Sequence, residues 1–386
     1  MGEIAIPDSF LRRPYAKEKF LAITNWAKQN HPFYRNWLSH ADREVPLLTR
    51  TDVLENNEKL LNGYPVTATT SGSTGVPVKV SWSKRRQKIE ELSINRLIGW
   101  LGGRMPVTRF IHSENPDGEN FDVSTPVADQ LALILKRYRL SGAVAITTYP
   151  SNAERICKEV RDKGLDMSFI RRFGVFAEVF EPPLEELIKQ TFPNAQIWSS
   201  YSCQEAGLIA GRCPHNPGCH HVMFGKLGIE ILDDSNKPCP EGVVGRVVIT
   251  DYFNLNAPLI RYDIGDLAAW GQCTCGKITN PSLSVIHGKI RGALLHKNGE
   301  RIPFINLSIA LRDIQGMRQY QVIQNTIDQF DVKVVYRDNN VTSTLHEQIG
   351  QAFYNHFGYT TEINLHLESE IKREANGKFY ASICKL

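Results

Sequence analysis

Apolar runs and helical periods alternate along the middle of this chain. Short apolar runs at 143–148, 174–180 and 195–199 predict buried strands. Between them, residues 153–163 and 184–192 repeat their apolar positions at helical spacing and predict helices. Strands that alternate with helices in this way predict an α/β fold built on a doubly wound, mostly parallel sheet.

The first hundred residues are predicted to be mainly helical, apart from one pair of strands. A helical period covers residues 9–60, and the runs 65–70 and 78–82 predict strands on either side of a polar loop. Ser83 is a good N-cap for a helix that continues to about Trp100. The expected apolar side of this helix carries Ile89, Leu92, Ile94 and Leu97.

The chain becomes β-rich after Glu205, and the pattern there predicts an antiparallel subdomain over about 206–286. A domain boundary is expected near 288–292. The elements predicted beyond it are strands at 320–322, 332–336 and 363–367 and a helix at 345–357. We therefore expect a large N-terminal domain over 1–288 and a small, mobile α+β domain over 289–386.

The composition is that of an ordinary globular protein and excludes several classes of partner. The 386 residues are 42% hydrophobic and 22% charged, with a net charge of +4, which is too small to indicate nucleic acid or a membrane surface. The basic cluster of Lys84, Arg85, Arg86 and Lys88 is interpreted as a solvated helix face. No apolar run reaches 18 residues, and no basic segment followed by an apolar stretch opens the chain, so a cytoplasmic protein is expected.

The densest candidate for chemistry is a hydroxyl-rich loop between two of the predicted strands. It comprises Thr69, Thr70, Ser71, Gly72, Ser73, Thr74, Gly75, Val76 and Pro77. Glycine lets a backbone approach a ligand closely, and successive N–H groups with hydroxyl donors form a concave site for anions. The loop is not a Walker A motif, because no Gly-Lys-Ser/Thr ending follows. A triphosphate site and an ordinary hairpin turn are both compatible with these residues.

Three further segments give the chain a resemblance to a known family. They are Tyr201-Ser202-Cys203-Gln204-Glu205, Arg261-Tyr262-Asp263-Ile264-Gly265-Asp266 and Arg373-Glu374-Ala375-Asn376-Gly377-Lys378. Together with the hydroxyl-rich loop, and in this order, they resemble the nucleotide-binding motifs of the adenylate-forming acyl-ligase superfamily: T-S-G-S/T-T-G-x-P, Y-G-x-T-E, Y-R-T-G-D and a C-terminal Gly-Lys. The segments 31–35, 46–50 and 273–276 are similar to the phenylacetate–coenzyme A ligase branch. The resemblance runs from about Phe33 to Lys378.

The resemblance implies an ATP-dependent enzyme that activates a carboxylic acid as an acyl-adenylate and passes the acyl group to a thiol, with coenzyme A expected. It implies that Glu205 binds Mg²⁺, Tyr201 lies against adenine, Asp266 accepts the ribose hydroxyls and Lys378 is catalytic. The remaining residues that it implies at the nucleotide and acid site are Ser71, Gly72, Ser73, Thr74, Gly75, Glu178, Ser202, Gln204 and Lys289. The first four also have purely structural interpretations: a packing aromatic for Tyr201, a surface carboxylate for Glu205, a turn former for Asp266 and a surface lysine for Lys378.

Several positions depart from the family pattern. Ser202 replaces a glycine and Gln204 replaces a threonine, although an amide can still donate to a phosphate oxygen. Asp263 stands where arginine is common and is expected to place an extra negative charge near the ribose. The hinge segment 288–292 lacks the family's acidic pair, while Lys289 can keep a cationic contact. A non-catalytic nucleotide-binding relative is therefore an alternative.

Half of the eight cysteines gather in two short segments. Cys213, Cys219, Cys273 and Cys275 can bind one structural Zn²⁺, with His215, His220 or His221 able to replace a thiolate. Reduced thiols without a metal are the main alternative, and a catalytic Cys-His pair is a third. The scattered Cys157, Cys203, Cys239 and Cys384 are expected to be ordinary small buried residues.

The sequence leaves the acid and the acyl acceptor open. Residues 173–178 are expected to line the acid pocket, where Phe176 could stack on an aryl group or simply pack in the core. Coenzyme A, an amine and a carrier-protein thiol all remain candidate acceptors. The oligomeric state is also open, with a homodimer as one option.

Overall fold

The computed structural model of the chain describes residues 14–39, 44–70, 77–112, 118–178, 180, 182–233, 235–289, 293–299, 301–312, 314–336, 343–372 and 380–386. They form two compact units. The first comprises Met1–Pro106, Arg172–Ala177 and Gln196–Ile286, and the second comprises Val107–Arg171, Glu178–Ala195 and His287–Leu386. The predicted boundary near 288–292 stays a prediction.

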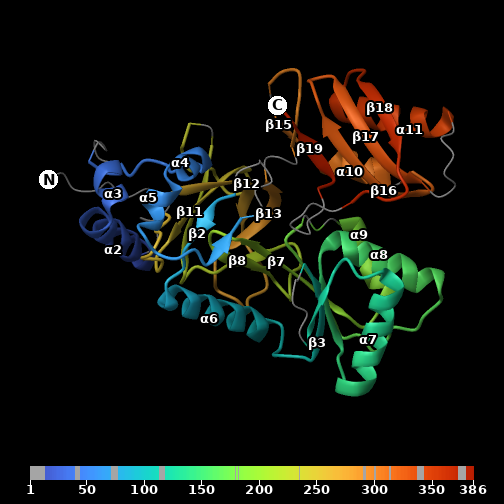
Figure 1. Ribbon diagram of the computed structural model, residues 1–386, viewed down its shortest axis with the longest axis horizontal. Helices are drawn as coiled ribbons and strands as arrows, with labels where there is room; N and C mark the ends of the chain where they lie inside the picture. Colours follow the sequence, from blue (N-terminus) through green and yellow to red (C-terminus); the bar gives the residue numbers. More distant parts are fainter. Residues whose placement is uncertain are drawn as a thin grey trace. The chain divides into compact units, whose positions relative to one another are not determined.

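The first unit opens with helices, as the periodicity of its sequence predicts. Their bounds are α2 Pro14–Asn30, α3 Pro32–Trp37, α4 Arg50–Glu55, α5 Asn57–Leu61 and α6 Lys84–Trp100 (Figure 1). Helix α4 begins with a capping box, in which the Thr49 hydroxyl accepts from the backbone N–H of Asp52 and the Asp52 carboxylate accepts from that of Thr49. The predicted strands around the hydroxyl-rich loop are confirmed but short: β1 Ala68–Thr69 pairs antiparallel with β2 Lys79–Val80.

The rest of the first unit is mainly sheet. In spatial order its strands are β10 Leu227–Leu232, β11 Gly245–Asp251, β12 Tyr262–Gly271, β13 Ser282–Lys289, β9 His220–Val222, β8 Gly207–Arg212, β7 Gln196–Cys203 and β6 Arg172–Phe176. Strands β6 and β7 pair parallel, whereas β7–β8, β8–β9 and β10–β11–β12 pair antiparallel. The β-rich character predicted after Glu205 is therefore confirmed. Apolar residues of β10, β11 and β12 join those of α2 and α3 in one core.

The second unit begins with alternating strands and helices. They are β3 Val107–Ile111, β4 Asn120–Asp122, α7 Val127–Ser141, β5 Ala145–Thr148, α8 Pro150–Asp162 and α9 Pro182–Thr191. Strand β3 pairs parallel with both β4 and β5, and α8 packs against both α7 and α9 (Figure 1). The predicted strand–helix alternation is confirmed here, and α7 is an element that the sequence pattern did not predict.

The C-terminal part of the chain has its own sheet and core. Its elements are β14 Ala293–Leu295, β15 Arg301–Pro303, α10 Ile305–Arg312, β16 Met317–Gln324, β17 Gln329–Tyr336, α11 Ser343–Phe357, β18 Glu362–Leu367 and β19 Ser382–Cys384. The sheet order is β18-β17-β16-β19, and Phe330 of β17 packs against Phe353 and Phe357 of α11. The small α+β domain expected from the sequence is present in this segment (Figure 1).

Helix α6 buries only part of the side that its apolar residues predict. Its cap is as expected, because the Ser83 hydroxyl accepts from the backbone N–H of Arg86 at 3.2 Å. Leu97 is buried and Ile89 is half-buried, as expected. Leu92 and Ile94 are 54% and 44% exposed, however, and the expectation that they face the core was wrong.

The buried residues of α6 are Arg86, Ser93 and Leu97. Lys84, Arg85 and Lys88 are exposed as expected, but Arg86 is fully buried, so the solvated-face interpretation was wrong for this residue. Asp251 of β11 and Glu90, one turn further along α6, compensate its charge. Within the described residues, none of the helices combines the length and apolar character needed to cross a bilayer.

Candidate active site

Strand β7 and the turn after it carry the second predicted motif. Tyr201 and Ser202 lie within β7 itself, and residues 204–206 form the turn into β8. Tyr201 and Glu205 are buried, whereas Ser202 and Gln204 are exposed. Ser202 and Gln204, the two departures from the family pattern, therefore have exposed side chains, whereas Tyr201 and Glu205, which match the pattern, are buried.

The carboxylate of Glu205 lies among polar groups from distant parts of the first unit. Arg50 Nη1 and the Tyr262 hydroxyl both lie 3.3 Å from Glu205 Oε1, and the Trp82 indole N–H donates to the Glu205 backbone carbonyl at 3.3 Å. Burial, and then the neighbouring Glu205, raises the pKa of Tyr262 well above its usual value. Tyr262 therefore stays a neutral donor beside a carboxylate that is only 3% exposed. A carboxylate oxygen held in this way suits a hard divalent cation such as Mg²⁺.

Tyr201 and Asp266 meet in the interior of the same unit. The Tyr201 hydroxyl donates to Asp266 Oδ2 at 2.7 Å, and the two residues are 8% and 4% exposed. Burial and the negative charge of Asp266 raise the pKa of Tyr201. The structure thus brings together the residues that the family resemblance assigns to the adenine and the ribose, although they are 65 positions apart.

The backbone before Asp266 is shaped by an unusual residue and a glycine. Arg261 has φ of 49° and Gly265 has φ of 73°, both in the left-handed region. Arg261 is buried and holds both carboxylate oxygens of Glu230 at 3.1 Å, as well as the Val45 carbonyl at 2.7 Å. This bidentate contact compensates a strained conformation that arginine rarely adopts.

Asp263 is compensated as well. Its carboxylate accepts from Arg246 Nη1 at 2.7 Å and from the backbone N–H of Gly265 at 2.9 Å. The expectation of an extra negative charge near the ribose is corrected by this ion pair, since Arg246 offsets the charge locally.

Arg50 contacts the candidate site and was not identified from the sequence. The backbone of Leu48 bonds to Arg261 and Asp263 on either side of Tyr262, at 2.8 and 2.9 Å, and fixes the start of α4 next to β12. Arg50 is the first residue of α4, and its guanidinium therefore reaches Glu205. The available signal was the segment 46–50, which resembles the family but carried no assigned role.

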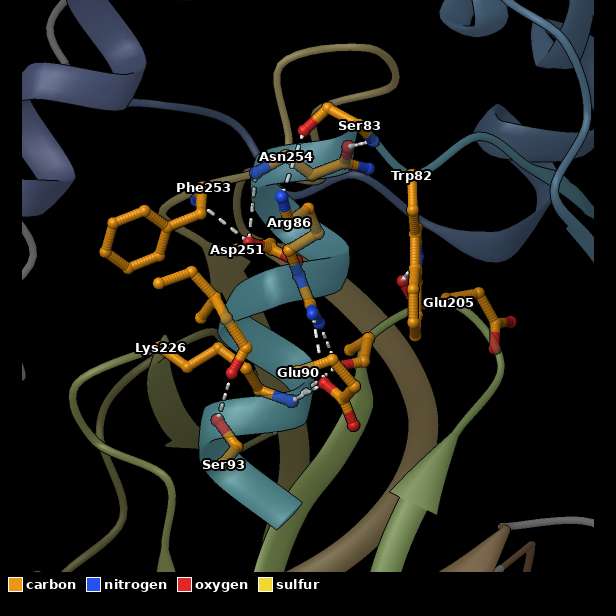
Figure 2. A network of polar contacts seen from close by, with 12 residues as sticks. Trp82, Ser83, Arg86, Glu90, Ser93, Glu205, Lys226, Asp251, Phe253 and Asn254 are labelled. Atoms are coloured by element: carbon orange, nitrogen blue, oxygen red, sulfur yellow. Dashed lines mark hydrogen bonds and ion pairs between the residues drawn. The ribbon is translucent and has the colours of Figure 1, made fainter. Parts of the chain in front are cut away.

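A buried ionic network lies along α6, next to the turn that carries Glu205 (Figure 2). Arg86 pairs with Asp251 and with Glu90, the latter at 2.9 Å, and Lys226 pairs with Glu90 at 2.7 Å. Burial, and then Arg86, lowers the pKa of Lys226 to about 8. Burial alone would raise the pKa of Glu90, but Lys226 and the other donors around it lower it. The network was not predicted, because its members are scattered along the sequence.

Several predicted residues cannot be placed. Ser71, Gly72, Ser73, Thr74 and Gly75 lie outside the described residues, as does Lys378. Lys289 ends strand β13, and its side chain is likewise outside the described part of the chain.

Glu178 and the expected acid-pocket strand can be placed separately. In the second unit, the Glu178 carboxylate accepts from the backbone N–H of Ser151 in the first turn of α8, at 2.8 Å. In the first unit, Phe173 is fully buried in β6, whereas Phe176 is only half-buried. A side chain at Gly174 would overlap the Trp198 indole, so glycine is required for this packing.

Cysteines from two loops converge with a histidine. The side-chain donor atoms of Cys213, His221, Cys273 and Cys275 all lie within 4.8 Å of one another. His221 Nδ1 lies 2.9 Å from the Asn280 carbonyl, which directs Nε2 toward the thiols; Nε2 is 3.7 Å from Cys275 Sγ. The set predicted first was Cys213, Cys219, Cys273 and Cys275. Among the described residues, the set that converges contains His221 instead of Cys219.

Cys219 and His220 border this Cys/His cluster. The thiol of Cys219 interacts with that of Cys273, and it also lies 3.8 Å from the Gln272 carbonyl and 3.6 Å from the Asn216 amide. His220 points elsewhere, and its Nε2 lies 3.0 Å from the Ser199 hydroxyl. Backbone N–H groups of Ile278 and Lys277 lower the pKa of Cys275 to about 6, which favours the thiolate form that binds metals.

Comparison with known proteins supports the family resemblance. Residues 294–385 match the family described as the CapK C-terminal domain. A phenylacetate–coenzyme A ligase of Thermus thermophilus is 22% identical over 88% of this chain and 83% of its own length. Protein CapK of Staphylococcus aureus is 20% identical over 94% of this chain and 86% of its own length. The predicted resemblance to the phenylacetate–coenzyme A ligase branch is confirmed.

Solved structures confirm the fold. A 2-hydroxyisobutyryl-CoA ligase, in complex with R3-HIB-AMP, superimposes with a TM-score of 0.76 at 16% identity. The match covers 98% of this chain and 90% of the ligase. The chain therefore has the fold of the adenylate-forming ligases, with a large mixed α/β body and a small α/β domain at the C-terminal end.

Proposed function

We propose that this protein is an ATP-dependent carboxylic acid ligase that forms an acyl-adenylate and then an acyl thioester. One observation carries the proposal. Two motifs about sixty positions apart meet twice, through Tyr201 with Asp266 at 2.7 Å and through Glu205 with Tyr262 at 3.3 Å. The pairs place an aromatic ring beside a carboxylate able to accept two hydroxyls, and a second carboxylate suited to a metal.

The first half-reaction joins the acid to AMP. A carboxylate oxygen of the acid attacks the α-phosphorus of ATP, the bond to the oxygen that bridges to the β-phosphate breaks, and pyrophosphate leaves. Asp266 would hold the ribose and Tyr201 would lie against the base. Mg²⁺ on Glu205 would neutralise phosphate charge when bound. The hydroxyl-rich loop and Lys378 are proposed to bind the phosphates and to stabilise charge at the α-phosphate.

The second half-reaction transfers the acyl group. The sulfur of a thiolate attacks the acyl carbon, the carbon–oxygen bond to AMP breaks, and AMP leaves with both electrons of that bond. Coenzyme A is the proposed thiol, because the aligned relatives include a phenylacetate–coenzyme A ligase and a 2-hydroxyisobutyryl-CoA ligase. An amine, a carrier-protein thiol and a protein that binds nucleotide without catalysis are the alternatives that an experiment must separate.

The test is pyrophosphate release from ATP with a panel of aryl and small aliphatic acids. Acid-dependent release is expected, followed by thioester formation when coenzyme A is added. ATP binding by calorimetry without release for any acid would instead identify a non-catalytic relative. Acid-dependent release with amide formation, but no thioester, would move the acceptor from a thiol to an amine.

We also propose that the Cys/His cluster binds one structural Zn²⁺ through Cys213, His221, Cys273 and Cys275. Three thiolates and an imidazole are a usual tetrahedral zinc set, and the bond from His221 Nδ1 to a backbone carbonyl is the expected outer contact. Cys213 comes from the β8–β9 loop, His221 from strand β9, and Cys273 and Cys275 from the β12–β13 loop, so the ion would join two segments distant in sequence.

Elemental analysis of protein purified without chelator tests this site, with about one Zn²⁺ per chain expected. Cys273→Ser should lose the metal, whereas the matched change Cys219→Ser, beside the cluster, should keep it. If Cys219→Ser loses the zinc and His221→Ala keeps it, the ligands would be the four cysteines Cys213, Cys219, Cys273 and Cys275. Protein that carries no zinc would contradict the site altogether.

A further inference from the structure

The backbone carbonyl of Ala206, the residue after Glu205, receives two buried cations. Arg86 Nη2 donates to it at 2.5 Å and Lys226 Nζ at 2.9 Å. Both side chains are almost completely buried, at 0% and 2% exposure. Hydrogen bonds from charged donors are stronger than those between neutral groups, so this carbonyl is held firmly.

The same network also binds the backbone on the C-terminal side of Gly207. Glu90 Oε1 accepts from the backbone N–H of Leu208 at 2.7 Å, while Glu90 Oε2 pairs with Lys226 and Arg86. With Asp251 bound to Arg86, two cations and two anions balance within the network. Gly207 lies between the two held groups with φ of 65°, and a Cβ there would overlap the Glu90 carboxylate.

Glu205 itself is held from the N-terminal end of α6. The Trp82 indole donates to its carbonyl, and the Arg86 guanidinium lies 4.5 Å from the Trp82 ring centre. Backbone groups of Glu205, Ala206 and Leu208 are therefore fixed by side chains in and just before α6 and by Lys226. Figure 2 shows Arg86, Glu90 and Lys226 in this network. The Glu205 side chain then leaves this turn toward Arg50 and Tyr262.

Stability alone does not account for such a network. Buried ion pairs are often no more stabilising than apolar residues of the same volume, because desolvation offsets their attraction. Their advantage is geometric: a fully bonded polar network specifies one arrangement of the backbone that it contacts.

We infer that Arg86, Glu90 and Lys226 are positioning residues that fix the carboxylate of Glu205 for Mg²⁺·ATP. This inference rests on the proposed function. None of the three touches the Glu205 carboxylate in the contacts described above; they act through the backbone on both sides of Gly207. They would do for Glu205 what outer contacts do for metal ligands in general, whose loss typically costs about 10- to 100-fold in metal affinity or activity.

The test compares a charge-balanced variant with wild type. Lys226→Met alone leaves Glu90 with one cation fewer and should lower the melting temperature. Lys226→Met/Glu90→Gln removes one charge of each sign and should recover much of that stability. The double variant should still need about 10-fold more Mg²⁺ for half-maximal ATP–pyrophosphate exchange. The control is Lys88→Met/Glu91→Gln, an exposed pair on the same helix, which should leave the Mg²⁺ dependence unchanged.

Milder changes keep the inference testable if the double variant does not fold. Trp82→Phe retains an aromatic ring under Arg86 but removes the donor to the Glu205 carbonyl, and it should shift the Mg²⁺ dependence in the same direction with little change in melting. Wild-type Mg²⁺ dependence in well-folded variants would show that the network is only structural.

Failure of the proposed function would be recognised separately, in the wild-type protein. If wild type shows no exchange with any acid, the same comparison is made by calorimetry of ATP binding at several Mg²⁺ concentrations. A shift there supports the positioning role without catalysis. Equal Mg²⁺ dependence in all variants, or no ATP binding by wild type, overturns it.

Discussion

At the scale of single residues, the pair Tyr201 and Asp266 illustrates how one side chain can have two tasks. The ring of Tyr201 is proposed to lie against adenine, while its hydroxyl holds the Asp266 carboxylate at 2.7 Å. The raised pKa of Tyr201 keeps that hydroxyl protonated, so it remains a donor. The two tasks can be separated, because phenylalanine keeps the ring and removes only the hydroxyl.

Tyr201→Phe should cost stability more than it costs nucleotide affinity. Removing the hydroxyl takes one donor from a buried carboxylate, which typically costs about 1–3 kcal/mol of unfolding free energy. Because the ring remains, ATP affinity should fall by less than about 10-fold, or 1.4 kcal/mol. Urea unfolding and calorimetry measure the two quantities, with the exposed Tyr138→Phe as control. A large loss of affinity with unchanged stability would contradict this division of tasks.

Lys378→Ala should abolish adenylate formation while ATP binding stays nearly intact. The positive charge is expected to act where negative charge accumulates in the transition state, and loss of one such group typically lowers the rate about 10²- to 10³-fold. Pyrophosphate exchange and calorimetry provide the two readouts. The control is Lys372→Ala, at an exposed lysine a few positions earlier in the sequence, and it should behave as wild type. A Lys378→Ala variant with full exchange activity would show that this lysine has no part in the chemistry.

At the scale of elements, α6 is the helix that organises the candidate site. Its N-terminal half presents Arg86 and Glu90 to the β7–β8 turn, and its outward side carries Leu92 and Ile94. Apolar residues at helical spacing normally mark the buried side of a helix. In α6, ion-paired side chains occupy much of the buried side, because Asp251 pairs with Arg86 and Lys226 pairs with Glu90.

Gly207→Ala should disturb this arrangement more than a change at a comparable glycine. Gly207 and Gly142 both have positive φ, of 65° and 62°, so alanine is strained at either position. At Gly207 the added methyl would also overlap the Glu90 carboxylate, whereas nothing lies within 4 Å at Gly142. We expect about 1 kcal/mol of destabilisation for Gly142→Ala and clearly more for Gly207→Ala, with lower exchange activity only in the latter.

Thermal melting and pyrophosphate exchange of the two variants measure this difference. Equal effects of the two substitutions would mean that the turn tolerates displacement. In that case, the close packing of Glu90 against Gly207 would not be needed to hold Glu205 in position.

At the scale of the whole molecule, the candidate nucleotide site and the Cys/His cluster belong to the same compact unit. Tyr201, Glu205 and Asp266 lie in it together with Cys213 and His221. The two groups of residues do different work in our proposal: the first performs chemistry, and the second joins loops of the sheet.

Removal of zinc should therefore lower the thermal stability of the protein while its exchange activity is still unchanged. Structural zinc contributes binding free energy directly to folding, so a strong chelator should lower the melting temperature of wild-type protein. Zinc-free Cys273→Ser should melt at the lower temperature whether or not chelator is present. Exchange activity of the zinc-free protein, measured well below its melting point after the chelator is removed and Mg²⁺ is restored, should remain close to that of untreated protein. A selective loss of activity without a melting shift would assign the metal to the chemistry instead.

Much of this molecule followed from local pattern. The α/β class, the capped helix after Ser83, the β-rich region after Glu205 and the small C-terminal domain were all predicted, and the fold is confirmed. Local periodicity and capping depend on residues a few positions apart, which a sequence displays directly. The order of the motifs likewise indicated the family, while the roles of their residues, including Ser71 to Gly75 and Lys378, stay predictions.

Only the tertiary structure decided which charges are buried and which ligands meet. Arg86 looked like a surface residue until Asp251, 165 positions away, supplied its counter-charge. Asp263 looked unbalanced until Arg246 on the neighbouring strand paired with it. His221 of β9 takes the place first given to Cys219, because the contact of its Nδ1 with the Asn280 carbonyl points its Nε2 at the thiols. The free energy of a charge or a metal ligand depends on all its neighbours in space, and strand pairing, not sequence distance, brings those neighbours together.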